Sequence, residues 1–514
     1  MKTEIVIVGG GPCGLLTALL LGRLGVQTVL LEKHREVLDH PKAMGVMRRT
    51  NEIFRQMGLL ERVAAGAMKS HPDALSVWFR GALGAQELGR ALMSEDDPAL
   101  SPCTRFHCPQ PHIERVLRDE VARQPSVKCL YETHFDSLEQ DAQGVRVAFT
   151  SHQTGQAQTI EAQYLVAADG DRSAIRDSLG IARQGPGERG RFLSVYFKAD
   201  LSARLHGRLG VLCNVVDEDM FEAFVAVNGK DLWLMHHFLD ESDQNQTHTV
   251  EQMRRVVARA SGVSPDAVEI LSMNPWVMSP AVAPRWREGR VFLVGDAAAR
   301  VSPAGGLGMN NGLQSAHNLA WKLAQVVNEI APESLLDSYE QERLPAARFT
   351  FENSEGNSNE VFNAVQAAMS GQWDRARDIV QHSRRAASGY GQDFGIVYDS
   401  CAITPDGTQA QTPADVINEY IAQARPGHRA PNFEVQVNGK ADSVFSLLDY
   451  QYTALLGPKA EFAQYKRLWP WAVQVSDDRD FSADPAWLSL YDISKHGAVL
   501  IRPDGYVAAR EPCR

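Results

Sequence analysis

The N-terminal part of the chain alternates short apolar runs with amphipathic segments. Residues 5–8 (Ile-Val-Ile-Val) and 28–31 (Thr-Val-Leu-Leu) are apolar runs of strand length, and residues 12–24 between them have a helical pattern. A strand, a helix and a second strand in this order form a βαβ unit, which builds a parallel sheet with helices on its faces. Two further helices and a group of strands are predicted to follow, over 49–60, 110–123 and 127–168.

The middle of the chain has a different pattern. From about residue 190 to 280, longer stretches alternate apolar and polar side chains, which is typical of an antiparallel sheet. The clearest of these stretches are 192–201, 221–227 and 231–239. We expect them to form a separate substrate-binding sheet. A short buried strand returns at 290–294, followed by an amphipathic helix over 313–330 and by further helices to about residue 388.

The last part of the chain predicts a small α/β domain. A loop over 389–415 precedes it, and it ends in a hairpin over 498–507 that turns at a Pro-Asp-Gly sequence. Strands are expected at 443–448, 452–456 and 472–475. Only residues 508–514 follow the hairpin, and Pro512 leaves no room among them for a terminal helix. We therefore expect one sheet face to be left partly uncovered, or to be covered by helices from residues 355–425 or by a partner subunit.

Composition and charge exclude several functional classes. The 514 residues carry 52 Lys and Arg against 63 Asp and Glu, for a net charge of −11, and no run concentrates the basic residues. A nucleic-acid surface is therefore not expected. The seven cysteines form no Cys-x-x-Cys, which argues against a zinc ribbon or a dithiol site. The chain starts without a signal peptide, and its most apolar helical stretch, 15–21, is far short of a membrane span. We expect a cytoplasmic protein without a membrane partner, as a monomer or homodimer.

A glycine motif connects the first strand to the first helix. In Gly9-x-Gly11-x-x-Gly14, the first glycine permits a tight turn, the second lets a pyrophosphate approach the backbone, and the third lets helix and strand pack closely. Glu32 ends the next strand, where a carboxylate can accept ribose hydroxyls. The alternative is a glycine-rich turn of another α/β fold. With strand, helix and acid all in place, we favour a dinucleotide site.

A second glycine-rich segment follows the strand at 290–294. It places Asp296 at the carboxyl end of that strand, where α/β sheets bind ligands, and its carboxylate suits a polyol chain such as ribityl. The glycines of residues 303–310 then turn into the next helix, whose positive end would stabilise a reduced flavin. Taken alone, this segment is equally consistent with a structural strand–helix turn. A third segment, Asp169-Gly170 after an apolar strand, is by itself an ordinary turn.

Together, in this order and spacing, the three segments resemble the class A flavoprotein monooxygenases, the family that includes para-hydroxybenzoate and phenol hydroxylases. Three shorter matches support the resemblance, at 40–43 (His-Pro-Lys-Ala), 108–110 (Cys-Pro-Gln) and 335–345. The resemblance implies an α/β fold with an α+β substrate domain. Its expected parts are a Rossmann-type FAD-binding domain (1–185 and 281–355), an antiparallel substrate sheet (186–280), a helical connection (356–425) and a thioredoxin-like domain without Cys-x-x-Cys (426–514).

The resemblance also implies the cofactors and the reaction. FAD would be bound and NADH or NADPH transient, and a flavin hydroperoxide formed with O2 would hydroxylate a phenolic or fused-ring aromatic substrate. The residues that it places around FAD are Gly9, Gly11, Pro12, Cys13, Gly14, Glu32, Lys33, Lys42, Gln110, Asp169, Gly170, Asp296, Pro303, Gly306, Leu307, Gly308, Met309 and Asn310. Lys42 and Ala299 depart from the Arg and His usual in the family. An FAD-binding protein without turnover therefore stays open as an alternative. Within the fold, epoxidation or Baeyer–Villiger chemistry is a second alternative to ring hydroxylation.

Residues for the substrate are expected on the middle sheet. Alternation along 231–238 puts His236 and His237 on opposite faces, so one of them faces the pocket and could take or relay a phenol proton. A packing or surface histidine is the more conservative interpretation. Tyr196, Phe224, Met235 and Met278 are further candidates for substrate contact.

Overall fold

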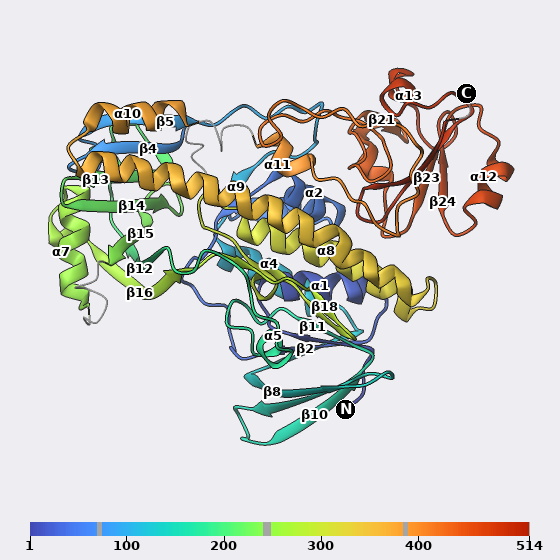
Figure 1. Ribbon diagram of the computed structural model, residues 1–514, viewed down its shortest axis with the longest axis horizontal. Coiled ribbons are helices and arrows are strands. Elements are labelled where there is room, and N and C mark those ends of the chain that lie inside the picture. The colour runs from blue at the N-terminus through green and yellow to red at the C-terminus, as the bar shows by residue number, and fades with distance from the viewer. Residues whose placement is uncertain (69–73, 240–247, 384–388, 513–514) are drawn as a thin grey trace.

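The computed structural model describes residues 1–68, 74–239, 248–383 and 389–512 (Figure 1). Its N-terminal part is a six-stranded sheet of order β18-β19-β11-β1-β2-β7, in which all neighbours except β18 and β19 pair in parallel. The strands are β1 (Ile5–Val8), β2 (Thr28–Glu32), β7 (Val127–Tyr131), β11 (Tyr164–Ala167), β18 (Arg287–Glu288) and β19 (Val291–Leu293). The predicted βαβ unit is therefore confirmed, and its strands are buried apolar runs, as a sheet covered on both faces requires.

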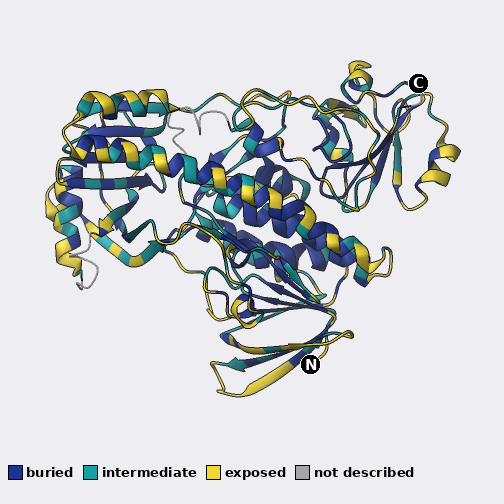
Figure 2. Ribbon diagram, viewed as in Figure 1, coloured by how far each residue is buried: buried dark blue, intermediate teal, exposed yellow. Residues whose placement is uncertain are grey.

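Helices α1 (Pro12–Arg23), α4 (Gln110–Val121) and α8 (Gly308–Val327) pack together beside this sheet. Figure 2 shows α1 and α8 as largely buried helices at the centre of the molecule. The helix expected over 49–60 is divided into α2 (Arg48–Gln56) and α3 (Leu60–Ala64), because Gly58 takes a positive φ of 64° between them. A small sheet of β8 (Thr133–Gln140), β9 (Val145–Ser151) and β10 (Ala157–Ala162) extends the fold near the N-terminus (Figure 1).

The middle domain is a seven-stranded sheet of order β16-β12-β15-β14-β13-β4-β5. Five strands come from the predicted region: β12 (Gly190–Lys198), β13 (Gly210–Asp217), β14 (Met220–Ala226), β15 (Leu232–Leu239) and β16 (Glu269–Met278). The range 186–280 is too narrow for this sheet, because β4 (Ala74–Arg80) and β5 (Gln86–Leu92) also belong to it. The local pattern does not show this, since β4 pairs in parallel with β13, far along the chain.

Helices cover both faces of this sheet. Apolar side chains of α7 (Val250–Ser261) pack against one face, in a core that includes Val195, Phe224 and Met253. On the other side, α9 (Asp337–Met369) and α10 (Trp373–His382) pack against β4, β5 and β13. Helix α9 crosses from this sheet to the far end of α8 (Figure 1), so one continuous helix joins the two domains.

The C-terminal domain has a four-stranded sheet of order β24-β23-β25-β26. Its strands are β23 (Thr453–Leu456), β24 (Val473–Ser476), β25 (Ala498–Ile501) and β26 (Val507–Glu511), beside a hairpin of β21 (Glu434–Val437) and β22 (Lys440–Ser443). The strand expected at 443–448 is wrong: Val444–Leu447 form a 3-10 turn, because the Ser443 hydroxyl accepts a hydrogen bond from the backbone N–H of Phe445.

Both faces of this sheet are covered from within the domain. Tyr465 of α12 (Phe462–Leu468) and Trp469, which follows this helix, pack on one face, and Trp487 of α13 (Ala486–Leu490) packs on the other. Residues 507–511 form a strand and not a terminal helix, as expected. We expected one sheet face to be left partly uncovered, or to be covered by helices from residues 355–425 or by a partner subunit. This expectation is wrong, because α12 covers that face.

A buried ionic cluster attaches the C-terminal hairpin to α8 and α9. Arg502 donates to both carboxylate oxygens of Glu342, at 2.6 and 2.8 Å, and also pairs with Asp504. Lys322 of α8 donates to the same Glu342 carboxylate at 2.7 Å. Burial alone would raise the pKa of Glu342, but Arg502 and Lys322 outweigh it and hold that pKa far below its ordinary value. The side chains of Lys322, Glu342 and Arg502 are fully buried.

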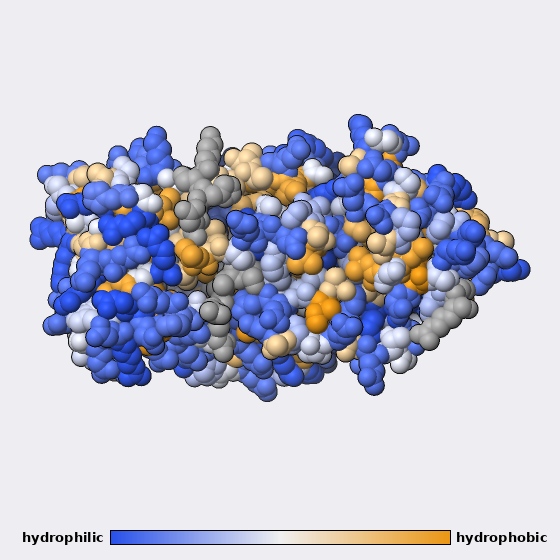
Figure 3. Space-filling view, turned by 90° about the horizontal axis from the view of Figure 1, so that it is seen from above, coloured by the Kyte–Doolittle hydropathy of each residue, from blue (hydrophilic) through white to orange (hydrophobic). Residues whose placement is uncertain are grey.

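The surface is mostly hydrophilic where it is seen from above, with apolar side chains in separate groups (Figure 3). Among the described residues, no helix is long and apolar enough to cross a membrane.

Candidate active site

A cavity of about 620 Å³ lies where the glycine-rich turns of the N-terminal sheet meet one face of the seven-stranded sheet. Turns that follow β1, β11 and β19 supply one end of its wall, at the carboxyl ends of those strands. Most of the predicted cofactor residues line it: Gly11, Pro12, Cys13, Lys42, Gln110, Gly170, Asp296, Pro303, Gly306, Leu307, Gly308 and Met309. Segments far apart in sequence thus converge on one site.

Gly9 and Gly14 lie behind the cavity wall and are required by the turn itself. Gly9 has a φ of +108°, and a Cβ there would lie 2.2 Å from the carbonyl oxygen of Ala168. A Cβ on Gly14 would lie 1.9 Å from the carbonyl oxygen of Gly9. Gly11 differs, because nothing lies within 4 Å of the position that its Cβ would take. The backbone at Gly11 therefore has room for a ligand beside the first turn of α1, whose N–H groups are free to bind an anion.

Glu32 ends β2 beside this turn, outside the cavity lining. Its carboxylate accepts hydrogen bonds from the backbone N–H groups of Gly10, at 2.6 Å, and His34, at 2.7 Å. These bonds fix the carboxylate while leaving lone pairs for ligand hydroxyls. Lys33 is exposed next to it and also does not line the cavity.

Asp296 reaches the cavity on a short 3-10 turn, Gly295–Ala297, that follows β19. The turn is tight: Gly295 has a φ of +66°, and a Cβ there would lie 2.9 Å from Sγ of Cys13. The Asp296 carboxylate is accessible because it faces the cavity, yet the surrounding protein desolvates it. That desolvation, with the neighbouring charge of Asp171, raises its pKa. Hydroxyl donors from a ligand would stabilise this carboxylate.

Asp169 is half-buried just before Gly170. Its Oδ2 accepts a hydrogen bond from the backbone N–H of Ile175 at 3.3 Å, while Oδ1 is buried without a hydrogen-bond partner among the described residues. Burial raises the pKa of this carboxyl group. An unsatisfied buried acceptor costs about 1–3 kcal/mol, and a bound group that donates to Oδ1 would remove that cost.

Helix α8 begins at Gly308, earlier than the expected start at residue 313. The glycine-rich turn is shorter than the sequence pattern indicates, with positive φ angles of 97° at Gly305 and 66° at Gly306. Its first residues, Gly308 and Met309, line the cavity, so the positive end of a 20-residue helix faces the site.

Asn310 follows in the same turn of α8 but does not line the cavity. Its side chain accepts from the backbone N–H of Met47 at 2.9 Å and donates to the carbonyls of Gly45, at 2.9 Å, and Gly306, at 2.8 Å. The residue therefore ties two loops of the wall together, and its contact with the flavin stays a prediction.

Lys42 and Gln110 also line the cavity. The Lys42 side chain is exposed. Gln110 starts α4 and donates through Nε2 to Glu114 at 2.6 Å. The neighbouring His40 has Nδ1 2.7 Å from Oγ of Ser272, and burial together with Lys42 lowers its pKa to about 4. It is therefore neutral at physiological pH.

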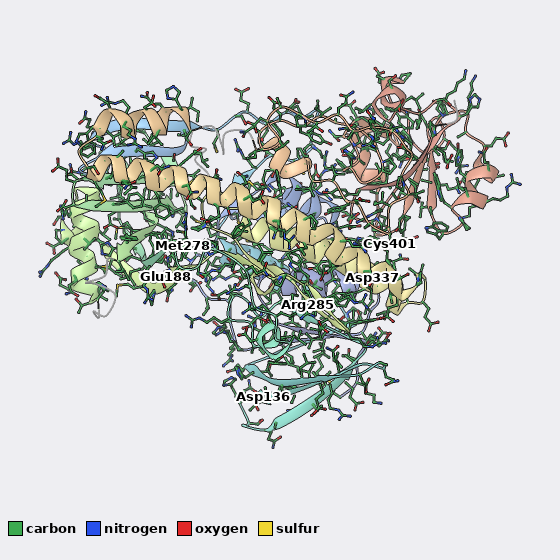
Figure 4. The ribbon with its side chains drawn as sticks, viewed as in Figure 1. Asp136, Glu188, Met278, Arg285, Asp337 and Cys401 are labelled. Atoms are coloured by element: carbon green, nitrogen blue, oxygen red, sulfur yellow. The ribbon has the colours of Figure 1, made fainter. Side chains whose placement is uncertain are left out.

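The other end of the cavity is formed by the seven-stranded sheet. His236 lines it and makes an edge contact with Trp276, with ring centroids 5.6 Å apart. Trp276 stacks on Phe192 at 4.6 Å, so these rings form an aromatic wall. Met278 also lines the cavity, at the junction of the sheet with the N-terminal domain (Figure 4).

His236 is poorly suited to hold a proton. Its Nδ1 lies 3.3 Å from Oγ of Ser194, and burial, with the nearby His40, lowers its pKa to about 4. Transfer of a proton to it from a phenol, with a pKa of about 10, is unfavourable by a factor of about a million. The lowered pKa favours a hydrogen-bonding role for His236, and the role of proton acceptor or relay stays a prediction.

Four other candidates from the sequence do not line the cavity. Phe224 and Met235 belong to the core beneath the sheet, because strand alternation turns them toward α7. His237 is on that face too, with its Nδ1 2.6 Å from Oε1 of Glu222. Tyr196 packs in an apolar group beside the cavity and makes an edge contact with His40.

Several lining residues were not predicted. They come from β4, β13 and β14 and from helices α9 and α10, and include Trp78, Asn214, Ala223, Val361 and Val380. The sequence does contain one signal that could have identified Asn214 as a lining residue. It is a polar residue inside the apolar run Val211-Leu-Cys-Asn-Val-Val216. The contributions of α9 and α10 depend on tertiary packing and had no local signal.

Comparison with known proteins matches two parts of the chain to family models. Residues 2–354 match the family described as "FAD binding domain", and residues 423–514 match "Aromatic-ring hydroxylase, C-terminal". The chain belongs to the FAD-dependent aromatic-ring hydroxylases. Tetracenomycin A2 monooxygenase-dioxygenase of Streptomyces glaucescens is 33% identical, over 99% of this chain and 94% of that protein. The 4-methyl-5-nitrocatechol 5-monooxygenase of a Burkholderia species is 31% identical, over 99% and 94%.

Solved structures give the same result. The flavin-dependent monooxygenase PieE, in complex with FAD and substrate, has a TM-score of 0.93 and 29% identity, over 100% of this chain and 96% of that chain. The aklavinone-11 hydroxylase, in a ternary complex with FAD and aklavinone, has a TM-score of 0.82 and 27% identity, over 99% and 95%. This aromatic-ring hydroxylase is thus an FAD-dependent monooxygenase of aromatic compounds, and the main hypothesis from the sequence is confirmed.

Proposed function

We propose that this hydroxylase acts on phenols with two or more fused rings, with NADH or NADPH as reductant and O2 as the oxygen source. The observation that carries the proposal is the extent of the cavity. It continues from Gly11 and Asp296 to an apolar chamber bounded by the seven-stranded sheet, by Val361 of α9 and by Val380 of α10. Pockets that bind apolar ligands bury most of the ligand surface, so a chamber of this breadth favours a multi-ring substrate.

The names of the relatives leave the number of rings open. They include tetracenomycin A2 monooxygenase-dioxygenase and polyketide hydroxylases, but also 2,4-dichlorophenol 6-monooxygenase. The breadth of the apolar chamber is therefore what favours the larger substrates for this chain.

Four features would hold FAD. The backbone at Gly11 and the N-terminus of α1 would bind the pyrophosphate, and Glu32 the adenosine ribose. Asp296 would accept hydrogen bonds from the ribityl hydroxyls. The N-terminus of α8, at Gly308, would stabilise negative charge on the reduced ring. The open space at Gly11 and the desolvated Asp296 carboxylate fit these roles.

When bound, FAD supplies hydride acceptance from NAD(P)H and the activation of O2 for transfer to an electron-rich ring. The residues of this chain position the ring and exclude water. Phe192, Trp276 and Met278 give the chamber an apolar wall, which keeps bulk water from the reacting atoms. His236, neutral at physiological pH, can form a hydrogen bond with a substrate hydroxyl without removing its proton.

The test uses the purified FAD-bound protein with 2-naphthol and phenol as probes. We expect 2-naphthol to stimulate NADH or NADPH oxidation and O2 uptake more than phenol does, and to yield a hydroxylated product that carries 18O from 18O2. The product would be identified by mass spectrometry. Equal or greater stimulation by phenol would contradict the fused-ring preference. Reductant oxidation that gives only hydrogen peroxide with both probes would also contradict the proposal.

A further inference from the structure

One row of side chains crosses the cavity face of the seven-stranded sheet. On adjacent antiparallel strands, Asn214 of β13 lies directly opposite Ala223 of β14, and Ala223 lies directly opposite His236 of β15. Directly paired residues project from the same face, and all three line the cavity. Two polar side chains therefore flank one methyl group, with about 10 Å between the outer Cα atoms.

Asn214 is a polar residue in apolar surroundings. Its side chain is only 4% exposed, and it shares the cavity wall with Trp78, Leu212 and Val225. Among the described residues, no group is hydrogen-bonded to its side-chain amide, whose polar atoms keep access to the cavity. A polar amide set in an apolar wall normally forms a hydrogen bond, to protein, to water or to a ligand. Because Asn214 faces the cavity, the partner that fits is a ligand in that cavity.

At the other end of the row, the His236 ring also has a nitrogen that forms no hydrogen bond with the described residues. Nδ1 contacts Ser194, and the second ring nitrogen, Nε2, has no partner among the residues that the structure describes. Between the two polar residues, the small side chain of Ala223 leaves a flat floor. An amide both donates and accepts, and a neutral imidazole nitrogen donates or accepts, so both ends suit hydroxyl or carbonyl oxygens.

We propose that Asn214 is a specificity-determining residue that, with His236, binds oxygen atoms at opposite ends of a flat ring system lying across Ala223. This inference rests on the proposed function, since it says how a fused-ring phenol is held. It narrows the substrate to ring systems that carry oxygen at both ends. A ring with one oxygen reaches only one of the two polar residues.

The experiment compares two probes in three forms of the FAD-bound protein. The probes are 2,6-dihydroxynaphthalene, with a hydroxyl at each end, and 2-naphthol, with one hydroxyl. The proteins are wild type, Asn214→Leu and the control Asn274→Leu. Asn274 lies in the same row on the edge strand β16, opposite Ser194, but is exposed and does not line the cavity. Dissociation constants are measured from the change in flavin absorbance on titration.

Wild type and Asn274→Leu should bind the diol about three- to tenfold more tightly than 2-naphthol, as one additional hydrogen bond provides. Asn214→Leu should bind the two probes with equal affinity, with an unchanged flavin spectrum. A diol preference that persists in Asn214→Leu, or that wild type lacks, would overturn this inference and leave the fused-ring proposal standing. Wild-type protein that binds neither naphthol would contradict the fused-ring proposal, and this inference with it.

Discussion

The substitution Gly11→Ala tests whether Gly11, in the first glycine motif, is needed for FAD binding or for folding. Gly11 has a φ of −75°, which alanine adopts without strain, and its Cβ would have no neighbour within 4 Å. The free energy of unfolding of the FAD-free protein should therefore change by no more than about 1 kcal/mol. The new methyl group, however, occupies the space in which a pyrophosphate would approach the backbone. Loss of one charge-assisted hydrogen bond costs about 1.5–3 kcal/mol, so FAD affinity should fall at least tenfold.

Gly14→Ala is the matched control for this experiment. Its Cβ would lie 1.9 Å from the carbonyl oxygen of Gly9, so the added methyl should displace α1 from β1 and lower the stability of the FAD-free protein. Thermal unfolding of the flavin-stripped proteins measures the first effect, and titration with FAD, followed by flavin fluorescence, measures the second. Wild-type FAD affinity in Gly11→Ala, or a large loss of stability in its FAD-free form, would refute the assignment of this space to the cofactor.

Three further predictions concern the other parts of the molecule. Asp296→Ala should weaken FAD binding about ten- to a hundredfold, because ribityl hydroxyls would face a methyl group; unchanged affinity in the same titration would mean that the ribityl site lies elsewhere. Arg502→Met should lower the free energy of unfolding by about 3–5 kcal/mol, since it leaves the buried Glu342 with Lys322 as its only cation in the cluster; wild-type stability in urea would contradict this. His236 should stay neutral from pH 6 to 8, because its pKa is lowered to about 4 and protonation sets in only near that pH. Substrate affinity measured from pH 6 to 8 should therefore show no inflection near pH 6.5 caused by His236. An inflection that is present in the wild type and absent in His236→Gln would contradict this prediction.

The sequence predicted the elements whose signals are local. The run at residues 5–8, the helix from Pro12 and the glycine motif are all read from adjacent residues, and each lies where it was expected. The position of Asp296 followed in the same way, because a buried strand that ends in Gly-Asp delivers the carboxylate to the carboxyl edge of the sheet. Cofactor residues on such turns were therefore brought together at the cavity.

Features that depend on distant pairing were missed. The place of β4 in the middle sheet is decided by its pairing with β13, which no local pattern encodes. Phe224 and Met235 are apolar and lie on strands of the predicted substrate sheet, but the sequence does not say which face of a two-sided sheet is the cavity. Asn310 shows a third limit, since its hydrogen bonds to two protein loops depend on distant segments that the local sequence does not place.

The ionic cluster between the domains also has a consequence for synthesis of the chain. Glu342 is separated from Arg502 by 160 residues. At about 5–20 residues per second, the ribosome takes roughly 10–30 seconds to supply that partner. During this interval α8 and α9 have been made, but the surface that will receive the hairpin still contains a carboxylate neutralised by Lys322 alone. The buried parts of α8 and α9 that contact the hairpin therefore stay without it until Arg502 has been made, and we expect nascent chains stalled near residue 420 to be vulnerable to proteases and dependent on chaperones.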